Sequence, residues 1–140
     1  MATAMTGCAM TATQRMAADE ASFASPSSAG RADGPRGDAA RGREVIMGRD
    51  GNCLLCHAIA ETGAQIMGNL GPPLTGVGAR LSQAQLRLRI EDPQRFNPDS
   101  IMPAYARTEG LVQVGKSWRG KPILNARQIE DTVAFLATLR

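Results

Sequence analysis

The sequence predicts an all-α fold, in which three to five short helices are joined by long loops and preceded by an extended N-terminal tail. Three observations support this prediction. Segments with helical spacing follow helix-capping residues, no segment alternates as an exposed strand does, and the linking stretches are dense in glycine and proline. Of the 140 residues, 43% are hydrophobic and 21% are charged, so the chain should form one globular domain.

Residues 1–41 are expected to form the tail, because they are rich in Ala, Ser, Gly, Thr and Pro without sustained periodicity. Such a stretch is either disordered or laid against a partner. The folded domain should then span residues 42–140. No run of eighteen apolar residues is present, and the chain does not begin like a secretion signal. The sequence therefore predicts no membrane span, and we expect any export signal to have been removed or never included.

The first helix is expected just before a pair of cysteines. Asp38 is a candidate N-cap, and Val45 and Ile46 follow it at helical spacing. The Gly51-Asn52 pair should end this helix, since glycine and asparagine favour the conformations that terminate helices.

Two further helices share one capping pattern. Ser82 and Gln85 have the spacing of a capping box and precede an apolar run that ends before Pro93. Asn125 and Gln128 repeat this spacing, and apolar residues then follow a helical rhythm to the end of the chain. The sequence therefore predicts one helix after each of these pairs.

The interior is expected to need something other than side chains. Three short helices with long loops bury little surface, and aromatic residues make up only 4% of the chain. A flat cofactor would fill the gap. The formal net charge is +3, but the positive residues are scattered without aromatic residues between them, so no nucleic-acid binding is predicted.

The segment CLLCH at residues 53–57 carries the strongest chemical signal, and His57 within it is the only histidine. A zinc site needs four ligands, and the chain offers only Cys8, Cys53, Cys56 and His57, the first of them in the tail. A thioredoxin-like redox pair needs a βαβ surrounding that the helical pattern does not provide. Two buried cysteines beside a hydrogen-bonded histidine form a third, structural alternative.

Covalent haem attachment is the chemistry for which C-x-x-C-H is specific. Two thiols at this spacing can add across the two vinyl groups of one porphyrin, and the next histidine is directed to the iron as its proximal ligand. We therefore expect one covalently attached haem c, held by Cys53 and Cys56, with His57 as a metal ligand.

A second axial ligand is expected, because haem irons that transfer electrons usually have methionine or histidine in that position. With no second histidine, methionine is the candidate. Four of the seven methionines lie in the tail, Met47 should pack in the first helix, and Met67 follows His57 too closely. Met102 follows the second helix in a loop that Pro103 stiffens. We expect Met102 to be the second metal ligand, with core filling as the alternative.

These features resemble class I cytochrome c. GREVI resembles the first-helix pattern of that family, and DTVAFLATL resembles its C-terminal helix. The resemblance implies a cytochrome c fold wrapped around one haem. It also implies that Gly42 lets the first helix approach the last closely around Phe135 and Leu136.

The stretch LGPPLTGVGAR resembles the proximal loop of the same family. The resemblance implies that the Pro72 carbonyl accepts the Nδ1 hydrogen of His57, a bond that orients a ligating imidazole. It further implies that Arg80 lies near a haem propionate, with a solvent-facing loop charge as the alternative.

Residues 42–140 resemble SoxX, the small monohaem subunit of the SoxAX complex of bacterial thiosulfate oxidation, most clearly in MPAY and GKPIL. The resemblance implies a heterodimer with a SoxA-like haem subunit, which joins thiosulfate oxidatively to a cysteine of the SoxYZ carrier as an L-cysteine S-thiosulfotransferase. It implies that this chain has no catalytic residue of its own, and that it accepts the released electrons and passes them to a soluble cytochrome in the periplasm.

Two other functions remain open: a free electron-shuttle cytochrome and a haem-based ligand sensor. A subunit should present an apolar face near the haem edge, for which Ile101, Tyr105 and Trp118 are candidates. Cys8 is left over after haem attachment. It is a candidate for an intermolecular disulfide, a lipid anchor or an incidental thiol.

Overall fold

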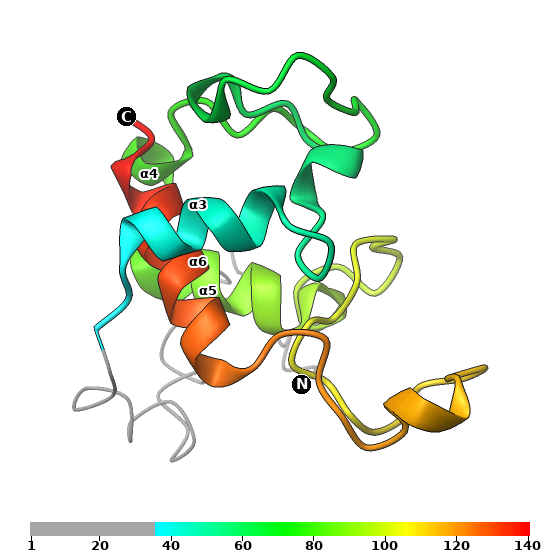
Figure 1. Cartoon of the computed structure of the whole chain (residues 1–140). Coiled ribbons are helices and arrows are strands. Elements are labelled where there is room, and N and C mark those ends of the chain that lie inside the picture. Colours follow the sequence, from blue (N-terminus) through cyan, green and yellow to red (C-terminus); the bar gives the residue numbers. More distant parts are fainter. Residues whose placement is uncertain (1–35) are drawn as a thin grey trace, which may run out of the picture. The chain divides into compact units, whose positions relative to one another are not determined.

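The computed structural model describes residues 36–140, which form four α-helices and no strand (Figure 1). These helices are α3 (Ala39–Met47), α4 (Val77–Arg80), α5 (Gln83–Glu91) and α6 (Ala126–Thr138). Single turns of 3-10 helix lie between them: η1 (Cys53–Leu55), η2 (Ala60–Thr62), η3 (Pro93–Arg95) and η4 (Lys116–Trp118). The all-α prediction is confirmed. No helix among these residues is long and apolar enough to cross a membrane.

Helices α3 and α6 cross and pack closely against each other (Figure 1). A Cβ at Gly42 would overlap the carbonyl oxygen of Asp131 and lie 2.9 Å from Cβ of Phe135, so only glycine allows this approach. Ile46 of α3 and Val133 of α6 are fully buried beside it. The close approach expected at Gly42 is therefore present, with Asp131 as the backbone neighbour.

A polar clamp joins the start of α3 to α6. The buried carboxylate of Asp131 accepts hydrogen bonds from the Asp38 amide at 2.7 Å and from Nε and Nη2 of Arg41 at 2.8 Å each. Asp38 caps α3 as expected, because its Oδ1 accepts from the Arg41 amide. Residues 36–41, which the sequence analysis assigned to the tail, thus contribute to the packed unit. Cys8 and the rest of the predicted tail lie outside the described residues.

The end of α3 differs from the expected position at Gly51-Asn52. The helix ends at Met47, because the Gly48 amide closes on the carbonyls of Glu44 and Val45 while its own backbone becomes extended. Met47 was expected to pack, but its side chain is 43% exposed.

Both expected capping boxes are present. Ser82 and Gln85 exchange side-chain-to-backbone hydrogen bonds at the start of α5, and Asn125 and Gln128 do so at the start of α6. A bidentate ion pair from Arg87 to Glu130 then joins the two helices, with both N–O distances at 2.6 Å.

The short helix α4 was not expected, because it lies in a stretch that the sequence analysis interpreted as an irregular loop. Four residues are too few for a detectable apolar period. The Gly78 amide donates to the Leu139 carbonyl at 2.8 Å, so α4 lies against the C-terminal end of α6.

Candidate functional site

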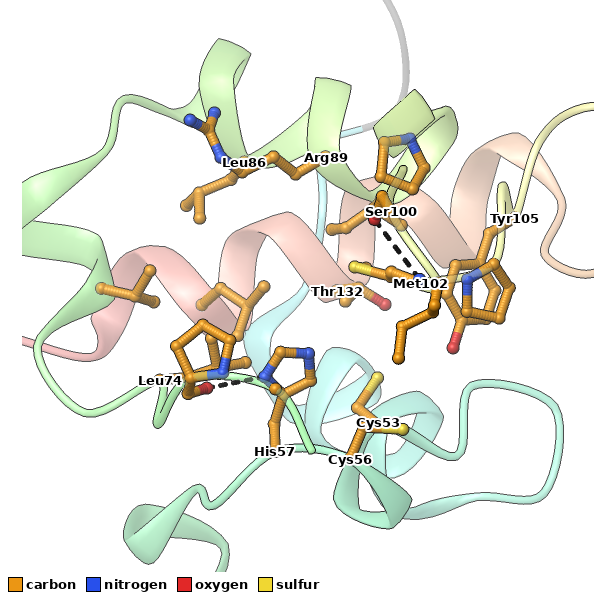
Figure 2. Close-up of a pocket in the computed structure, with 18 of the residues that line it drawn as sticks. Cys53, Cys56, His57, Leu74, Leu86, Arg89, Ser100, Met102, Tyr105 and Thr132 are labelled. Atoms are coloured by element: carbon orange, nitrogen blue, oxygen red, sulfur yellow. Dashed lines mark hydrogen bonds between the residues drawn. The ribbon is translucent and has the colours of Figure 1, made fainter. Parts of the chain in front are cut away.

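An apolar cavity of about 720 Å³ lies between the segment that follows η1, helices α4 and α5, the loop after η3, and α6. Its walls include Val77, Leu86, Ile90 and Leu136. Figure 2 labels Leu86 among them. A volume of this size is typical of sites that enclose a cofactor or other small molecule. The gap in the core that the sequence predicts is therefore present as a cavity, and Cys53, Cys56 and His57 of CLLCH line it.

The turn at η1 brings both cysteines and the histidine to one side of the cavity. The His57 amide donates to the Cys53 carbonyl at 2.9 Å, and the Cys56 amide donates to the same carbonyl at 3.2 Å. Asn52 precedes this turn with a φ of 45°, in the left-handed region. Cys53, Cys56 and His57 all line the cavity.

The state of the thiols bears on the alternatives to haem attachment. Cys53 and Cys56 are both free, and burial raises the pKa of the Cys53 thiol to about 11. Reactive dithiols have a lowered thiol pKa instead, so this pair does not resemble a redox-active one. Residues 36–140 also contain no group of three or more His, Cys, Asp or Glu side chains that could hold a metal ion. That observation leaves a zinc site without support in the described part.

The imidazole of His57 is fixed by the loop that follows it. Its Nδ1 lies 2.7 Å from the Pro72 carbonyl oxygen, the contact that the cytochrome c resemblance implies. Because a carbonyl only accepts, Nδ1 is the donor in this contact, and Nε2 is the ring nitrogen left to bind a metal. A Cβ at Gly71 would lie 2.8 Å from Nδ1 and 2.9 Å from Nε2, so this glycine packs directly on the ring. Sequence analysis had missed this role of Gly71.

Met102 enters the cavity from the side opposite His57 (Figure 2). Of the other methionines in the described region, Met67 is occupied elsewhere, since its sulfur accepts from the Ile59 amide at 3.1 Å. Met47 lies on α3 and does not line the cavity. The structure therefore brings together the two side chains that the sequence singled out as metal ligands.

Two arginines line the cavity. Arg80 is exposed, and its Nη1 donates to the Thr75 carbonyl at 2.7 Å. Its proposed contact with a propionate stays a prediction. Arg89 was not identified from the sequence; burial lowers the pKa of its guanidinium, which lies 4.4 Å from the centre of the Phe96 ring. Nothing in its helical segment distinguished Arg89 from the neighbouring arginines.

The three candidates for an apolar partner face separate into two groups. Ile101 is 75% exposed and Trp118 is 53% exposed. Tyr105 is buried instead, and its hydroxyl donates to the Gly51 carbonyl at 2.6 Å. Burial raises the pKa of Tyr105 to about 12. Tyr105 is therefore a core residue that links the Met102 loop to the turn before Cys53.

The donor set fits a covalently attached haem. Two free thiols and an imidazole with an available Nε2 lie on one side of an apolar cavity, and a thioether sulfur lies on the other. Thiolates, imidazole and thioether are the groups by which c-type haems are bound. No other histidine exists in the sequence to supply a different arrangement.

Comparison with known proteins gives the same result. The sequence model of the cytochrome c family matches residues 39–140. A chain in the crystal structure of SoxXA from P. pantotrophus is similar, with a TM-score of 0.70 and 37% sequence identity over 76% of this chain and 84% of that chain. No curated protein matches the sequence.

Proposed function

This chain belongs to the cytochrome c family, and we propose that it is the electron-transfer subunit of a complex like SoxXA. The family membership makes it an electron-transfer protein with one covalently attached haem c. The finer role, acceptance of electrons within a thiosulfate-oxidising complex, rests on the similarity to the SoxXA chain. The observation that carries the electron-transfer assignment is the placement of His57 and Met102 on opposite sides of one cavity.

The residues of this chain would bind the group as follows. Cys53 and Cys56 would form the thioether links, and His57 and Met102 would be the iron ligands from this chain. Bound in this way, haem c supplies a one-electron couple. The Pro72 carbonyl orients the imidazole through its contact with Nδ1. A thioether opposite it favours the reduced iron, so we expect a relatively high reduction potential.

Bond-making chemistry would take place elsewhere in the complex. The single imidazole has its Nδ1 on the Pro72 carbonyl and its Nε2 on the cavity side, so none remains as a general acid or base. We therefore assign this chain no catalytic residue. Its partner would be a SoxA-like haem subunit that joins thiosulfate to a cysteine of a SoxYZ-like carrier. This chain would pass the electrons to a soluble cytochrome, and the complex would operate in the periplasm.

Replacement of the distal ligand tests the electron-transfer site. We expect Met102→Ala to lower the midpoint potential and to let the reduced protein bind carbon monoxide at neutral pH, since the thioether no longer fills its position. Met67→Ala is the matched control, because the Met67 sulfur is held by the Ile59 amide. An unchanged spectrum and potential in Met102→Ala would exclude Met102 as the ligand.

Association tests the subunit role against that of a free shuttle. Gel filtration with and without a SoxA-like partner should show a stoichiometric heterodimer, with Ile101 and Trp118 as candidate contact residues. A chain that stays monomeric beside this partner would support a free electron-shuttle cytochrome instead. Carbon monoxide binding by the reduced wild type would support a sensor.

A further inference from the structure

Gln94 holds the backbone of Met102 through its side-chain amide. Its Nε2 donates to the Ser100 carbonyl at 2.8 Å and to the Met102 carbonyl, also at 2.8 Å. The Met102 amide in turn donates to the Ser100 hydroxyl at 3.3 Å (Figure 2). Both backbone polar groups of Met102 are thus fixed by side chains, rather than by regular secondary structure.

The base from which Gln94 reaches is itself well anchored. Gln94 lies in η3, directly after the buried Pro93. The amides of Phe96 and Asn97 donate to the Pro93 carbonyl at 3.1 and 2.9 Å, which closes this turn. The side chain therefore extends from a fixed turn to an otherwise irregular loop.

The amide orientation at Gln94 is dictated by its neighbours. Two carbonyl oxygens face the end of the side chain, and only Nε2 can donate to them. The opposite orientation would place Oε1 against both carbonyls. As it stands, Oε1 is buried and has no hydrogen-bond partner. A buried oxygen without a hydrogen-bond partner costs free energy. Gln94 bears this cost and still donates both hydrogen bonds, whereas an apolar residue used only for packing would bear no such cost.

We propose that Gln94 is a positioning residue, whose two hydrogen bonds to the loop, here called the latch, keep the Met102 sulfur available to bind the iron. The latch acts on the backbone at Ser100 and Met102 and does not touch the sulfur. Neighbouring Ile101 is 75% exposed and contributes little packing of its own. The hydrogen bonds from Gln94 therefore add to the restraint that the packing of Met102 against the core provides. The part of this inference that concerns binding of the iron rests on the proposed role of Met102 as a ligand.

The proposal is tested with two variants of the latch. Gln94→Leu removes both donors without burying a charge, and Gln94→Glu keeps the shape but replaces the donor by an acceptor. In the purified haem-loaded protein, the rate of carbon monoxide binding to the reduced form reports how often the Met102 sulfur dissociates from the iron. Loss of two hydrogen bonds should raise this rate about tenfold in Gln94→Leu. The midpoint potential should fall toward that of Met102→Ala.

Controls separate a latch from a general effect on folding. Gln83 is exposed in the first turn of α5, so Gln83→Leu and Gln83→Glu should leave the carbon monoxide rate unchanged. In a Met102→Ala background, Gln94→Leu should have no further effect on either readout, because no sulfur remains to be positioned. A purely structural role would change both backgrounds equally and would overturn the proposal.

Hydrogen exchange distinguishes failure of the latch from failure of the ligand assignment. The amide of Met102 should exchange faster in Gln94→Leu than in wild type, because its loop is less restrained. If Met102→Ala proves spectroscopically silent, the ligand assignment fails while the exchange rate still decides the latch. Unchanged exchange and unchanged carbon monoxide binding in Gln94→Leu would refute the latch.

Discussion

The two sides of the cavity are built in different ways. On the His57 side, the restraints come from nearby backbone: the Gly71 amide donates to the Cys56 carbonyl at 2.8 Å, and the Leu74 amide donates to the Ala58 carbonyl at 2.9 Å. On the Met102 side, backbone hydrogen bonds hold the loop at Ser100 and Tyr105, but the backbone of Met102 itself is held by the side chains of Gln94 and Ser100. The difference indicates that the histidine side is fixed by the local fold, whereas the methionine side can be tuned by single substitutions.

The largest effect is expected from a change on the His57 side. Gly71→Ala would place a Cβ within the contact distance of the imidazole ring, so either the ring or the loop must move. We expect strong loss of the six-coordinate visible spectrum and a loss of stability of about 3 kcal/mol, at the upper end for overpacking. Visible spectroscopy and denaturant unfolding would measure both.

Gly115→Ala is the matched control for that change. A Cβ at Gly115 meets nothing closer than 3.9 Å, and its φ of −55° suits alanine. A Gly71→Ala protein indistinguishable from this control would contradict the claim that the loop fixes the imidazole.

A smaller effect is expected where the two sides meet. Tyr105 follows the Met102 loop and donates to the Gly51 carbonyl at 2.6 Å, just before Cys53. Tyr105→Phe should lower the free energy of unfolding by about 1–2 kcal/mol, because this buried carbonyl loses its short hydrogen bond from the hydroxyl. Denaturant unfolding at pH 7 measures this loss.

The pH dependence of the Tyr105→Phe effect follows from its pKa, which burial raises to about 12. A raised pKa stabilises the folded state below the ordinary value near 10, and that contribution is lost as the pH rises through the folded-state pKa. The difference between wild type and Tyr105→Phe should therefore shrink above about pH 10. A difference that grows with rising pH would contradict the buried hydrogen bond.

The smallest effect is expected at the crossing of α3 and α6, where Asp131 lies. Hydrogen bonds from Arg41 hold the pKa of Asp131 below its usual range. A depressed carboxyl pKa stabilises the folded state above the ordinary value near 4, and this stabilisation is lost as the pH falls through the folded-state pKa. Asp131→Asn should thus be less stable at neutral pH, with a difference that diminishes in acid.

Unfolding curves at pH 7 and pH 3 would measure the effect of Asp131→Asn. Because asparagine can still accept from the Asp38 amide, its visible spectrum should match that of wild type. A spectral change in Asp131→Asn would mean that the contacts between α3 and α6 also determine the geometry of the cavity.

Short-range patterns in the sequence predicted much of this structure. The capping pairs located the starts of α5 and α6, and CLLCH located the cavity wall, because each signal lies within five residues. Met102 could be selected by elimination among the methionines. These features needed no knowledge of the tertiary fold.

The remaining features depend on contacts that no local pattern contains. The packing of Gly71 on the imidazole and the reach of Gln94 to Met102 arise only when loops fold back. The helix α4 is a single turn held by the Leu139 carbonyl. The early end of α3 is a local feature instead, because the Gly48 amide closes on the carbonyls of Glu44 and Val45. The packing of Gly71, the hydrogen bonds of Gln94 and the bounds of α4 therefore required the three-dimensional structure.

The central claim is that Cys53 and Cys56 hold one haem by covalent bonds. The most direct test is a visible spectrum of the matured protein after denaturation, reduction and extraction with acidified organic solvent. We predict that the haem absorption stays with the polypeptide, and that its intact mass exceeds that of its amino acids by one haem. Colour that leaves with the solvent, or a mass equal to that of the polypeptide alone, would contradict this account.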